Sequence, residues 1–535
     1  MDKQVNSSCV ITILTPQGEF RLPFQPGATL RDILAAGGFP VRSACGGNAG
    51  CGRCLVRVKD SHCIPYAEGE RHRLSETQLS AGWRLACRLN PTTNLNISIE
   101  APAIKTHWRP LRDDEYRPPV RPLMLRPAIM RYGVAIDLGT THIRLTLWDL
   151  PAGKRLAGRA GLNPQACYGA DVLTRLMEAG RSKAIADEIS GLARTAIGDA
   201  LTGVASKLAI DLQDVGAVRV VGNTAMMGLL SGKNAGLLLQ PEYWTQRLDI
   251  QPDDISPLQK AWGLSGNSVI RFITPLGGFI GSDLLAGIIA TRLIEQAAGA
   301  LLIDIGTNSE MALWDGEKLR VTSTAGGPAF EGCGISCGMP AEAGAIYRLQ
   351  SGHGNSFELG VLGNGKSSGV CGSGLVDAVA WLRHRGMLDK LGRYRDDRGE
   401  GFVLSETDRR IVLTRSDIDV FQRAKASIGG GVCRLCDQAG IAVASLSHVY
   451  VSGAFGRLLD VTNAQALGLL PPVPIERVHL EGNTALAGCE ELLLSSEGER
   501  AAAAVLAVSE VYNMAEDVAF ESLFVENLYL QPMRE

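Results

Sequence analysis

No run of apolar residues in this 535-residue chain approaches the roughly 18–20 needed to span a bilayer. The chain also lacks the basic region and apolar core of a secretory signal, because Met1–Leu14 leads directly into an alternating strand pattern. No long basic run of the kind that binds nucleic acid is present. We therefore expect a cytoplasmic protein without membrane or nucleic-acid partners, whose 13 cysteines are thiols or metal ligands and not disulfides.

The composition and length indicate several folded units. An apolar fraction of 45% and a charged fraction of 20% are ordinary for globular proteins, so the bulk of the chain is not disordered. A chain of 535 residues is too long to fold around a single hydrophobic core. Six prolines in residues 101–131 disfavour helix and central strand, which predicts a semi-rigid linker that lets the preceding domain swing.

The first hundred residues predict a small α+β domain. Cys9–Phe24 reads as two alternating strands around a turn at residues 15–18. A short helix is expected at Thr29–Ala36, ended by two glycines, and further strands at Leu55–Lys59 and Asn94–Glu100.

From Tyr132 onward the sequence repeats itself. The segment Val134–Asp149 returns as Leu302–Asp315: in both, an apolar run meets Asp-x-Gly-Thr and an alternating strand ends in Trp-Asp. A second repeat pairs Gly222–Met226 with Gly482–Leu486. Two matched repeats so far apart predict a duplicated α/β unit and not a short-period solenoid. The expected domains are 1–100, the linker 101–131, and two halves at 132–300 and 301–535.

Four cysteines have a spacing that suits an iron–sulfur cluster. They are Cys45, Cys51, Cys54 and Cys87. The first three lie in SACGGNAGCGRC, where glycines permit the loop conformations that bring thiolates onto two irons. A zinc site is the alternative, but zinc loops commonly use two C-x2-C pairs. The spacing resembles that of adrenodoxin-like [2Fe–2S] ferredoxins over residues 8–100.

Two matching hairpins predict a phosphate-binding cleft. Their residues run Asp137, Leu138, Gly139, Thr140, Thr141 and Asp304, Ile305, Gly306, Thr307, Asn308. Two carboxylates facing each other across a cleft suit Mg²⁺, which retains waters and few protein ligands. The pattern resembles the superfamily of acetate and sugar kinases, Hsp70 and actin. That resemblance implies that the hairpins hold the ATP phosphates, and that Gly453 and Gly456 in VYVSGAFG lie near adenosine.

Other candidates for this site carry open alternatives. Asp283 is a candidate acid or base that positions the attacking water, since the superfamily carries an acid late in its first half; a helix N-cap formed by Ser282 or Asp283 is the simpler interpretation. Gly326 and Gly327 lie in a second glycine-rich loop, which we expect to approach the nucleotide. Gly429–Gly431 is a third, for which a helix break is an equally good interpretation.

Two further cysteine pairs give weaker signals. Cys433 and Cys436 have no partner pair nearby, and their spacing suits two small residues on one helix turn. Cys333 and Cys337 lie in a glycine-rich turn, where we expect packing thiols.

The order of [2Fe–2S] domain, linker and duplicated ATPase resembles that of the reductive activators of corrinoid proteins. The strings TAGGPAFEGCGISCGMPAEAGAI and VYVSGAFG carry the likeness, which covers nearly the whole chain. It implies a β-grasp ferredoxin domain with a [2Fe–2S] cluster, and a duplicated ATPase that uses ATP and Mg²⁺. It also implies reduction of Co(II) to Co(I) in the corrinoid protein of a methyltransferase system. An electron donor is then required, and a homodimer is common in the family.

There are departures from that family, and other functions to consider. We expect the chain to lack a middle region that longer relatives place before the first hairpin, and it has no C-terminal [4Fe–4S] cysteine run.

One alternative function is that of a small-molecule kinase with a sensory cluster. Another is a redox-sensing scaffold, and a third is an ATP-dependent activator of a different low-potential enzyme such as a dehydratase.

Overall fold

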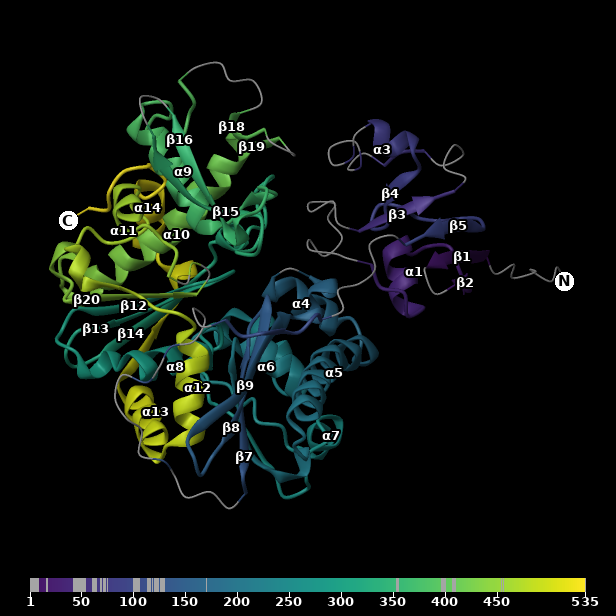
Figure 1. Cartoon of the computed structure of the whole chain (residues 1–535), viewed down its shortest axis with the longest axis horizontal. Coiled ribbons are helices and arrows are strands. Elements are labelled where there is room, and N and C mark those ends of the chain that lie inside the picture. Colours follow the sequence, from purple (N-terminus) through teal and green to yellow (C-terminus); the bar gives the residue numbers. More distant parts are fainter. Residues whose placement is uncertain are drawn as a thin grey trace. The chain divides into compact units, whose positions relative to one another are not determined.

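The computed structural model of the chain forms two compact units (Figure 1). The first comprises Met1–Trp108, Thr140–Ile143 and Gly161–Ala200, and the second comprises Arg109–Gly139, Arg144–Ala160 and Leu201–Glu535. The described residues are 9–15, 18–41, 54–59, 65–67, 70, 74, 76–99, 106–112, 117, 119, 125, 130–169, 171–352, 356–395, 401–406, 410–453, 455 and 457–534.

The N-terminal domain is a five-stranded mixed sheet with the strand order β2-β1-β5-β3-β4. Its strands are β1 (Cys9–Thr15), β2 (Gly18–Phe24), β3 (Leu55–Val58), β4 (Trp83–Leu85) and β5 (Leu95–Ser98). β1 pairs antiparallel with β2 from Cys9–Phe24 to Thr15–Gly18, and parallel with β5. The expected hairpin and the small α+β domain are confirmed.

Helix α1 (Leu30–Ala36) covers this sheet. Thr29 caps its N-terminus by accepting a hydrogen bond from the backbone N–H of Asp32. Leu30 and Leu34 are fully buried in the core with Ile11 and Ile97, and the helix ends at Gly37. The helix expected at Thr29–Ala36 is therefore confirmed. The other helices that begin in the first unit are α3 (Glu76–Ser80), η3 (Pro164–Tyr168), α4 (Val172–Gly180) and α5 (Lys183–Leu208).

Two six-stranded sheets follow, and they repeat one topology. Their orders are β11-β10-β7-β8-β9-β6 and β21-β20-β12-β13-β14-β22. The first contains β6 (Arg109–Pro110), β7 (Tyr132–Leu138), β8 (His142–Asp149), β9 (Lys154–Leu162), β10 (Val215–Gly222) and β11 (Val269–Phe272). The second contains β12 (Ala300–Ile305), β13 (Ser309–Trp314), β14 (Leu319–Thr324), β20 (His448–Gly453), β21 (Val478–Leu480) and β22 (Ser509–Tyr512).

The duplication extends to the pairing register. β7 lies parallel to β10, so that Leu138 stands opposite Gly222. β12 lies parallel to β20 in the same way, with Ile305 opposite Gly453. Each Asp-x-Gly hairpin therefore begins beside a neighbouring strand that ends in glycine, which confirms the expected duplicated α/β architecture.

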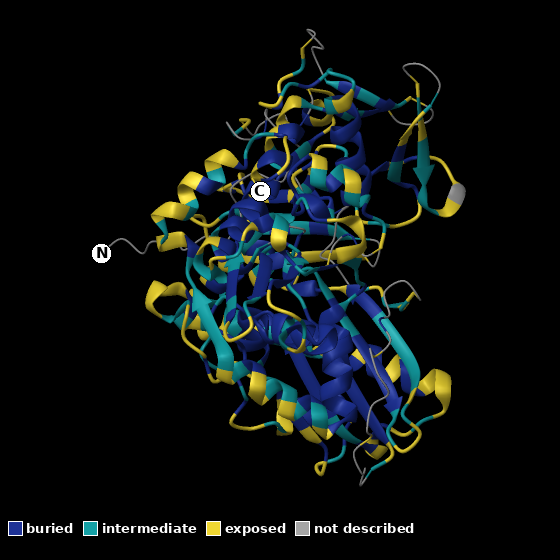
Figure 2. Cartoon of the chain, turned by 90° about the vertical axis from the view of Figure 1, so that its left-hand side faces the viewer, coloured by how far each residue is buried: buried dark blue, intermediate teal, exposed yellow. Residues whose placement is uncertain are grey.

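Two helices, α8 (Ser282–Thr291) and α12 (Thr484–Leu494), share one apolar core with both sheets. A Cβ at Gly488 of α12 would lie 1.9 Å from the backbone oxygen of Ala286 in α8, so only glycine permits this approach. Their apolar residues form one cluster with Ala135 of β7 and Leu302 of β12. Figure 2 draws the sheets and the helices between them mostly as buried.

The second half carries additional elements outside its large sheet. They are β15 (Ala345–Ser351), β16 (Phe357–Val361), β17 (Gly369–Val370), β18 (Phe402–Ser405), β19 (Ile411–Leu413), α9 (Gly372–His384), α10 (Arg415–Ala439), α11 (Val461–Ala466), α13 (Ser496–Val508) and α14 (Val518–Glu526). Helices α6 (Thr224–Ser231) and α7 (Ser256–Ala261) belong to the first half.

Both interpretations of Gly429–Gly431 are wrong, because these glycines lie inside the continuous helix α10. A Cβ at Gly430 would lie 3.2 Å from the backbone nitrogen of Phe524 in α14, and one at Gly431 would lie 2.4 Å from Cε of Met311 in β13. The three glycines therefore let α10 pack closely against its neighbours.

From Arg109 onward, the described residues of the proline-rich linker belong to the second unit, whereas the hydroxyl of Thr106 donates a 2.9 Å hydrogen bond to the oxygen of Leu162 within the first unit. Arg109 and Pro110 form β6, an edge strand that pairs antiparallel with β9. The Arg117 guanidinium pairs with Glu481 at 2.6 Å, and Leu125 forms a bridge with Ser495. An edge position is compatible with the expectation that prolines exclude central strands.

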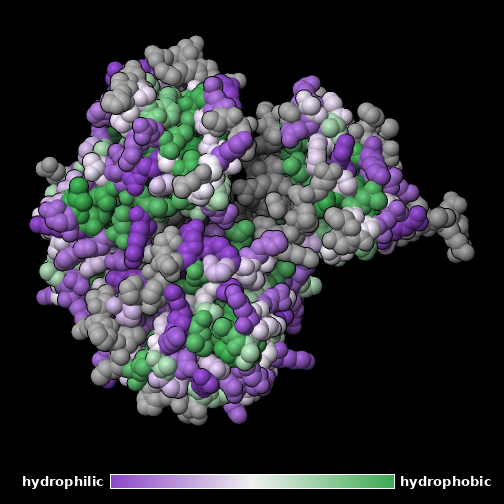
Figure 3. Space-filling model, viewed as in Figure 1, coloured by the Kyte–Doolittle hydropathy of each residue, from purple (hydrophilic) through white to green (hydrophobic). Residues whose placement is uncertain are grey.

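Among the described helices, none has the length and apolar character needed to cross a membrane. The face drawn in Figure 3 mixes hydrophilic and hydrophobic residues.

Candidate functional site

Asp137 stands near the end of β7 with its side chain almost fully buried. Its Oδ2 accepts a 2.6 Å hydrogen bond from Nδ2 of Asn483, the N-cap of α12, and lies 3.5 Å from Nη1 of Arg144. Burial raises the pKa of Asp137, although Arg144 and Asn483 act in the opposite direction. The second repeat, GNTAL, thus supplies a residue that orients the first Asp.

Asp304 occupies the matching position in β12. Burial raises its pKa to about 6, and the charge of Asp137 contributes, while the neighbouring Ser452 and the charge of Arg144 oppose the shift. Since each half contributes one of these aspartates, the duplication brings two carboxylates into electrostatic contact.

Asp283 joins the same group from the first turn of α8. Burial, followed by the charges of Asp137 and Asp304, raises its pKa to about 7. The N-cap of α8 is Gly281, so the interpretation of Ser282 or Asp283 as a cap is wrong. Ser282 instead accepts a 3.2 Å hydrogen bond from the backbone N–H of Gly222.

Glu310 is a fourth member of this carboxylate group, and no motif in the sequence had pointed to it. It lies on β13 directly opposite Asp304 in the antiparallel hairpin and is buried. Burial and the charges of Asp283 and Asp304 raise its pKa well above the ordinary value. The raised pKa values of Asp283 and Glu310 favour the protonated forms of these two carboxyl groups. The signal available in the sequence was the hairpin itself, which places residue 310 across from 304.

Gly453 ends β20 within this site. A Cβ there would lie 2.2 Å from the backbone oxygen of Ile305 and 2.5 Å from Oδ1 of Asp304, and the residue has a φ of +92°. The approach of β20 to the Asp304 hairpin therefore depends on glycine. Gly456, the other glycine predicted for this turn, is outside the described residues.

Replacing Gly453 by Ala should destabilise the second unit by about 2–4 kcal/mol, because a backbone clash adds to an unfavourable φ. Gly440→Ala is the matched control, since Gly440 has a φ of +66° but no atom within 4 Å of the position that a Cβ would take. Urea unfolding followed by circular dichroism measures both variants. Equal destabilisation of the two would show that the close approach at Gly453 carries no cost.

The remaining predicted nucleotide residues lie in turns around these aspartates in the sequence. Thr307 donates a 2.5 Å hydrogen bond to Glu331, which ends η8 (Pro328–Glu331). Gly327 precedes η8 with a φ of +77°, and a Cβ at Gly326 would lie 2.7 Å from Oγ of Ser427. Gly306 and Asn308 lie between β12 and β13, and Gly139, Thr140 and Thr141 lie between β7 and β8. Their contacts with a nucleotide stay predictions.

The carboxylate group (Asp137, Asp283, Asp304 and Glu310) suits a phosphate-bound cation better than an all-protein metal cage. Within the described part of the chain, no three or more His, Cys, Asp or Glu side chains are arranged to hold a metal. A hard cation such as Mg²⁺ commonly uses one or two carboxylates, with phosphate oxygens and waters completing its shell.

Apparent Mg²⁺ affinity in the presence of ATP should fall as the pH is lowered from 8 to 6. The pKa values of about 7 for Asp283 and about 6 for Asp304 are raised, so both groups take up protons in this range, and protons compete with the cation. One competing proton gives about a tenfold loss per pH unit below its pKa. Titration of ATPase activity with Mg²⁺ at each pH measures this, and a flat profile would contradict the electrostatics described here.

Cys54 and Cys87 come together in the N-terminal domain. Cys54 precedes β3, Cys87 follows β4, and both are nearly fully buried. The backbone N–H of Ala86 donates a 2.8 Å hydrogen bond to the oxygen of Cys54, which holds the two segments side by side. Cys45 and Cys51 fall outside the described residues. Two buried thiols at adjacent strand ends fit the expected [2Fe–2S] site.

A buried ion pair supports this arrangement. Glu70 and Arg84 are both fully buried, and their closest oxygen and nitrogen atoms are 2.6 Å apart. Glu70 also accepts a 2.8 Å hydrogen bond from the backbone N–H of Leu85. The pair therefore orders β4 immediately before Cys87.

Cys433 and Cys436 are buried in α10, and burial raises the pKa of both thiols, that of Cys436 to about 12. Such thiols are poor nucleophiles and poor metal ligands. The geometry agrees with their interpretation as small residues on one helix turn.

Comparisons with known proteins cover nearly the whole chain. Residues 14–92 match the model of the 2Fe-2S iron-sulfur cluster binding domain. Residues 132–296 match the RACo middle region, and residues 298–535 match the C-terminal domain of RACo, the ASKHA domain. A curated relative, the corrinoid activation enzyme RamQ of Eubacterium limosum, is 31% identical over 421 residues, which are 74% of this chain and 70% of that protein. The chain belongs to the RACo family of corrinoid activators.

A second curated relative is the [Co(II) methylated amine-specific corrinoid protein] reductase of Methanosarcina barkeri. It is 28% identical to this chain over 393 residues, which are 68% of the chain and 70% of that protein. The solved structure named reductive activator for corrinoid, iron-sulfur protein is 24% identical, covers 98% of both chains and has a TM-score of 0.67, so it shares the RACo fold.

The matches correct one expectation from the sequence. The chain does not lack the middle region of the RACo family: residues 132–296 match that region and include the Asp137 hairpin. The first half of the duplicated unit and the middle region are therefore the same segment.

Proposed function

We propose that this chain reductively activates the corrinoid protein of a methyltransferase system, passing one electron to cobalt so that Co(II) becomes Co(I), at the expense of ATP. The observation that carries the proposal is the match to both RACo regions behind a 2Fe-2S domain. The names of two relatives with similar coverage, a corrinoid activation enzyme and a corrinoid protein reductase, support the same substrate class. A kinase or a scaffold would not require this combination.

In the proposed ATP site, the two halves supply equivalent parts. Asp137 and Asp304 would hold Mg²⁺ through few direct contacts, with Asn483 orienting the first carboxylate. The phosphate contacts are assigned to the two hairpins, through Gly139, Thr140, Thr141, Gly306, Thr307 and Asn308. The other nucleotide contacts are assigned to the glycine turns, through Gly326, Gly327, Gly453 and Gly456.

Asp283 and Glu310 are assigned to the attacking water. Because its pKa is raised to about 7, Asp283 is partly ionised near neutral pH and can orient water and take its proton. Glu310, whose pKa is raised well above its ordinary value, would stay neutral and add no further negative charge to the group. The charges of Asp137 and Asp304 favour the protonated form of Asp283 until a cation neutralises them.

The N-terminal domain would hold the redox centre through Cys45, Cys51, Cys54 and Cys87. When bound, a [2Fe–2S] cluster supplies one electron at a time at low potential. The chain's own contribution is a buried, ordered position for Cys54 and Cys87, which excludes water from that side of the site. The electron would come from a separate low-potential donor, in a cytoplasmic setting, and a homodimer is compatible with the family.

ATP contributes to such a reduction only if its binding or hydrolysis favours one state of the complex over another. In the duplicated architecture, a nucleotide that contacts both hairpins would stabilise a closed arrangement of the two halves. We propose that the closed form binds the Co(II) protein in a state that accepts an electron more readily.

The test is the visible spectrum of a corrinoid protein under anaerobic conditions, mixed with this chain, a reductant and Mg-ATP. ATP-dependent loss of the Co(II) band with growth of the Co(I) band is expected. An unchanged spectrum, with the cluster shown to be reduced and several corrinoid proteins tried, would overturn the proposal.

A further inference from the structure

Helix α1 lies directly against the segment that carries Cys87. The backbone N–H of Arg31 donates a 3.0 Å hydrogen bond to the oxygen of Ala86, and the N–H of Leu30 donates a 2.7 Å bond to the oxygen of Leu89. The two bonds therefore attach the chain to α1 on either side of Cys87, at Ala86 and at Leu89. The first turn of α1, including Arg31, is thereby held beside a proposed cluster ligand.

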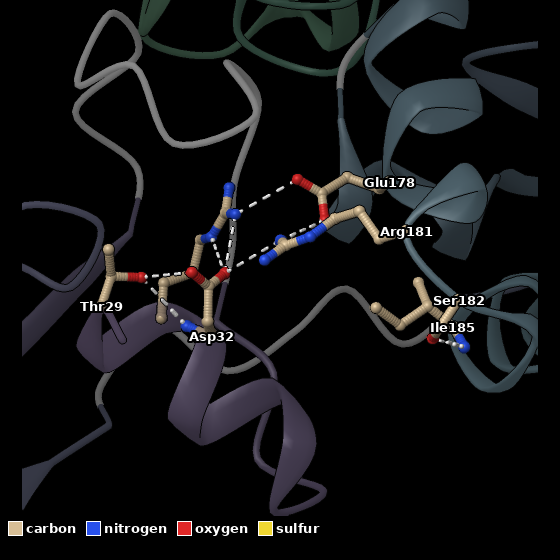
Figure 4. A network of polar contacts seen from close by, with 7 residues as sticks. Thr29, Asp32, Glu178, Arg181, Ser182 and Ile185 are labelled. Carbon is tan, nitrogen blue, oxygen red and sulfur yellow. Dashed lines mark hydrogen bonds and ion pairs between the residues drawn. The ribbon is translucent and has the colours of Figure 1, made fainter. Parts of the chain in front are cut away.

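The Arg31 side chain is largely buried, with 13% of its surface exposed. Its Nη2 lies 2.8 Å from Oδ1 of Asp32 and 3.3 Å from Oε1 of Glu178 in α4 (Figure 4). Arg181 completes the group, 3.0 Å from Glu178 and 3.8 Å from Asp32. Two cations and two anions thus alternate in one network within the first unit.

Although the network is neutral as a whole, it holds one of its cations, Arg31, on the helix turn that is bonded to the Cys87 segment. Burial alone would lower the pKa of Arg31, but the pairs with Asp32 and Glu178 outweigh it and raise the pKa, and the charge of Cys87 adds to the effect. A partly buried charge is screened less by salt than an exposed one, so its field reaches its neighbours. Arg31 is always charged at working pH, and its influence on the site is therefore constant.

We propose that Arg31 raises the reduction potential of the cluster bound at Cys87, and that Glu178 of α4 limits this effect by pairing with the guanidinium. Reduction adds one negative charge to the cluster, which a nearby cation stabilises and a nearby anion disfavours. Arg31 thus acts on the cluster through its positive charge and not as a ligand. The ion pair between Arg31 and Glu178 of α4 determines how strongly that charge changes the reduction potential. This effect rests on the proposed binding of a cluster, but it does not depend on which protein accepts the electron.

The test is a redox titration of the full chain, followed by the electron paramagnetic resonance signal of the reduced cluster, with no corrinoid protein present. Arg31→Gln should shift the one-electron equilibrium about three- to tenfold toward the oxidised form, where tenfold corresponds to about 59 mV. Glu178→Gln should shift it in the opposite direction. Arg31→Lys, which keeps the charge, should restore most of the wild-type potential.

Arg21→Gln is the matched control, because Arg21 lies in the same domain with 78% of its side chain exposed. A shift for Arg31→Gln no larger than that for Arg21→Gln would overturn the role of Arg31. Glu178→Gln should also have a smaller effect when Arg31 is already Gln. Equal effects in both backgrounds would show that Glu178 acts independently of Arg31, which contradicts the second part of the proposal.

Discussion

Asp304→Asn should lower the ATP-dependent rate of Co(II) reduction by about 10²–10³-fold, since an amide cannot supply the charge that holds a cation against phosphate. Asp304 lies at the end of β12, beside Gly453 and opposite Glu310. The loss should appear in the ATPase rate as well, whereas the spectrum of the oxidised cluster should be unchanged. Rates of Co(I) formation and of phosphate release measure the two activities.

Stability separates this functional role from a structural one. Burial already raises the pKa of Asp304, which means that its negative charge is unfavourable in the fold. At pH 8 the neutral Asn variant should therefore unfold at the same urea concentration as the wild type or a higher one. Asp253→Asn is the control, because Asp253 has 86% of its side chain exposed and pairs with Lys233 at the surface of the second unit. An unfolded Asp304→Asn protein, or one with full ATPase activity, would be incompatible with the proposed site.

Cys87→Ser should remove most of the bound cluster and all electron transfer to cobalt. A serine hydroxyl is a far poorer ligand for these irons than a thiolate, and Cys87 is buried where no exposed thiol can replace it. Iron and sulfide content, together with the visible absorption of the cluster, measure the loss. The ATPase half should keep its nucleotide affinity, because its assigned residues belong to other segments.

Cys9→Ser is the matched control for that experiment. Cys9 is a partly exposed thiol at the start of β1 in the same domain, and it is outside the proposed ligand set. Its replacement should leave the cluster content at the wild-type level. Equal loss in the two variants would indicate a general failure of the domain and not loss of a ligand.

Local patterns in the sequence were sufficient for much of the fold. The alternation in Cys9–Phe24 and the cap at Thr29 depend on residues within a few positions, and both are found in the structure. The repeated Asp-x-Gly-Thr strings predicted the two equivalent hairpins for the same reason. The proximity of Cys54 and Cys87, which are distant in the sequence, was expected from the four-cysteine pattern and its resemblance to [2Fe–2S] ferredoxins.

Long-range contacts account for what was missed. Glu310 and Asn483 reach the carboxylate group from β13 and from the start of α12, and their roles depend on tertiary packing that no short motif encodes. A continuous helix through Gly430 was not predicted because three consecutive glycines usually weaken a helix, whereas α14 here packs so closely on α10 that a Cβ at Gly430 would lie 3.2 Å from the backbone nitrogen of Phe524. Tertiary contacts thus outweighed local propensity.

Strand β6 has a consequence for the distance over which an electron can be carried. Arg109 and Pro110 pair with β9, and Arg117 forms an ion pair with Glu481. The proline-containing residues after Arg109 therefore do not add to the distance that the N-terminal domain can move from the second unit. The hydroxyl of Thr106 is also hydrogen-bonded to the oxygen of Leu162 at the end of β9, so only the eight steps from Ser98 to Thr106 can extend, giving a maximum of about 26–29 Å. A 31-residue linker would have allowed roughly 100–110 Å at full extension. Under the proposed function, the cluster would have to meet its electron donor and the cobalt from within this short radius, so lengthening the chain between Ser98 and Thr106, and not beyond it, should alter the rate of electron delivery.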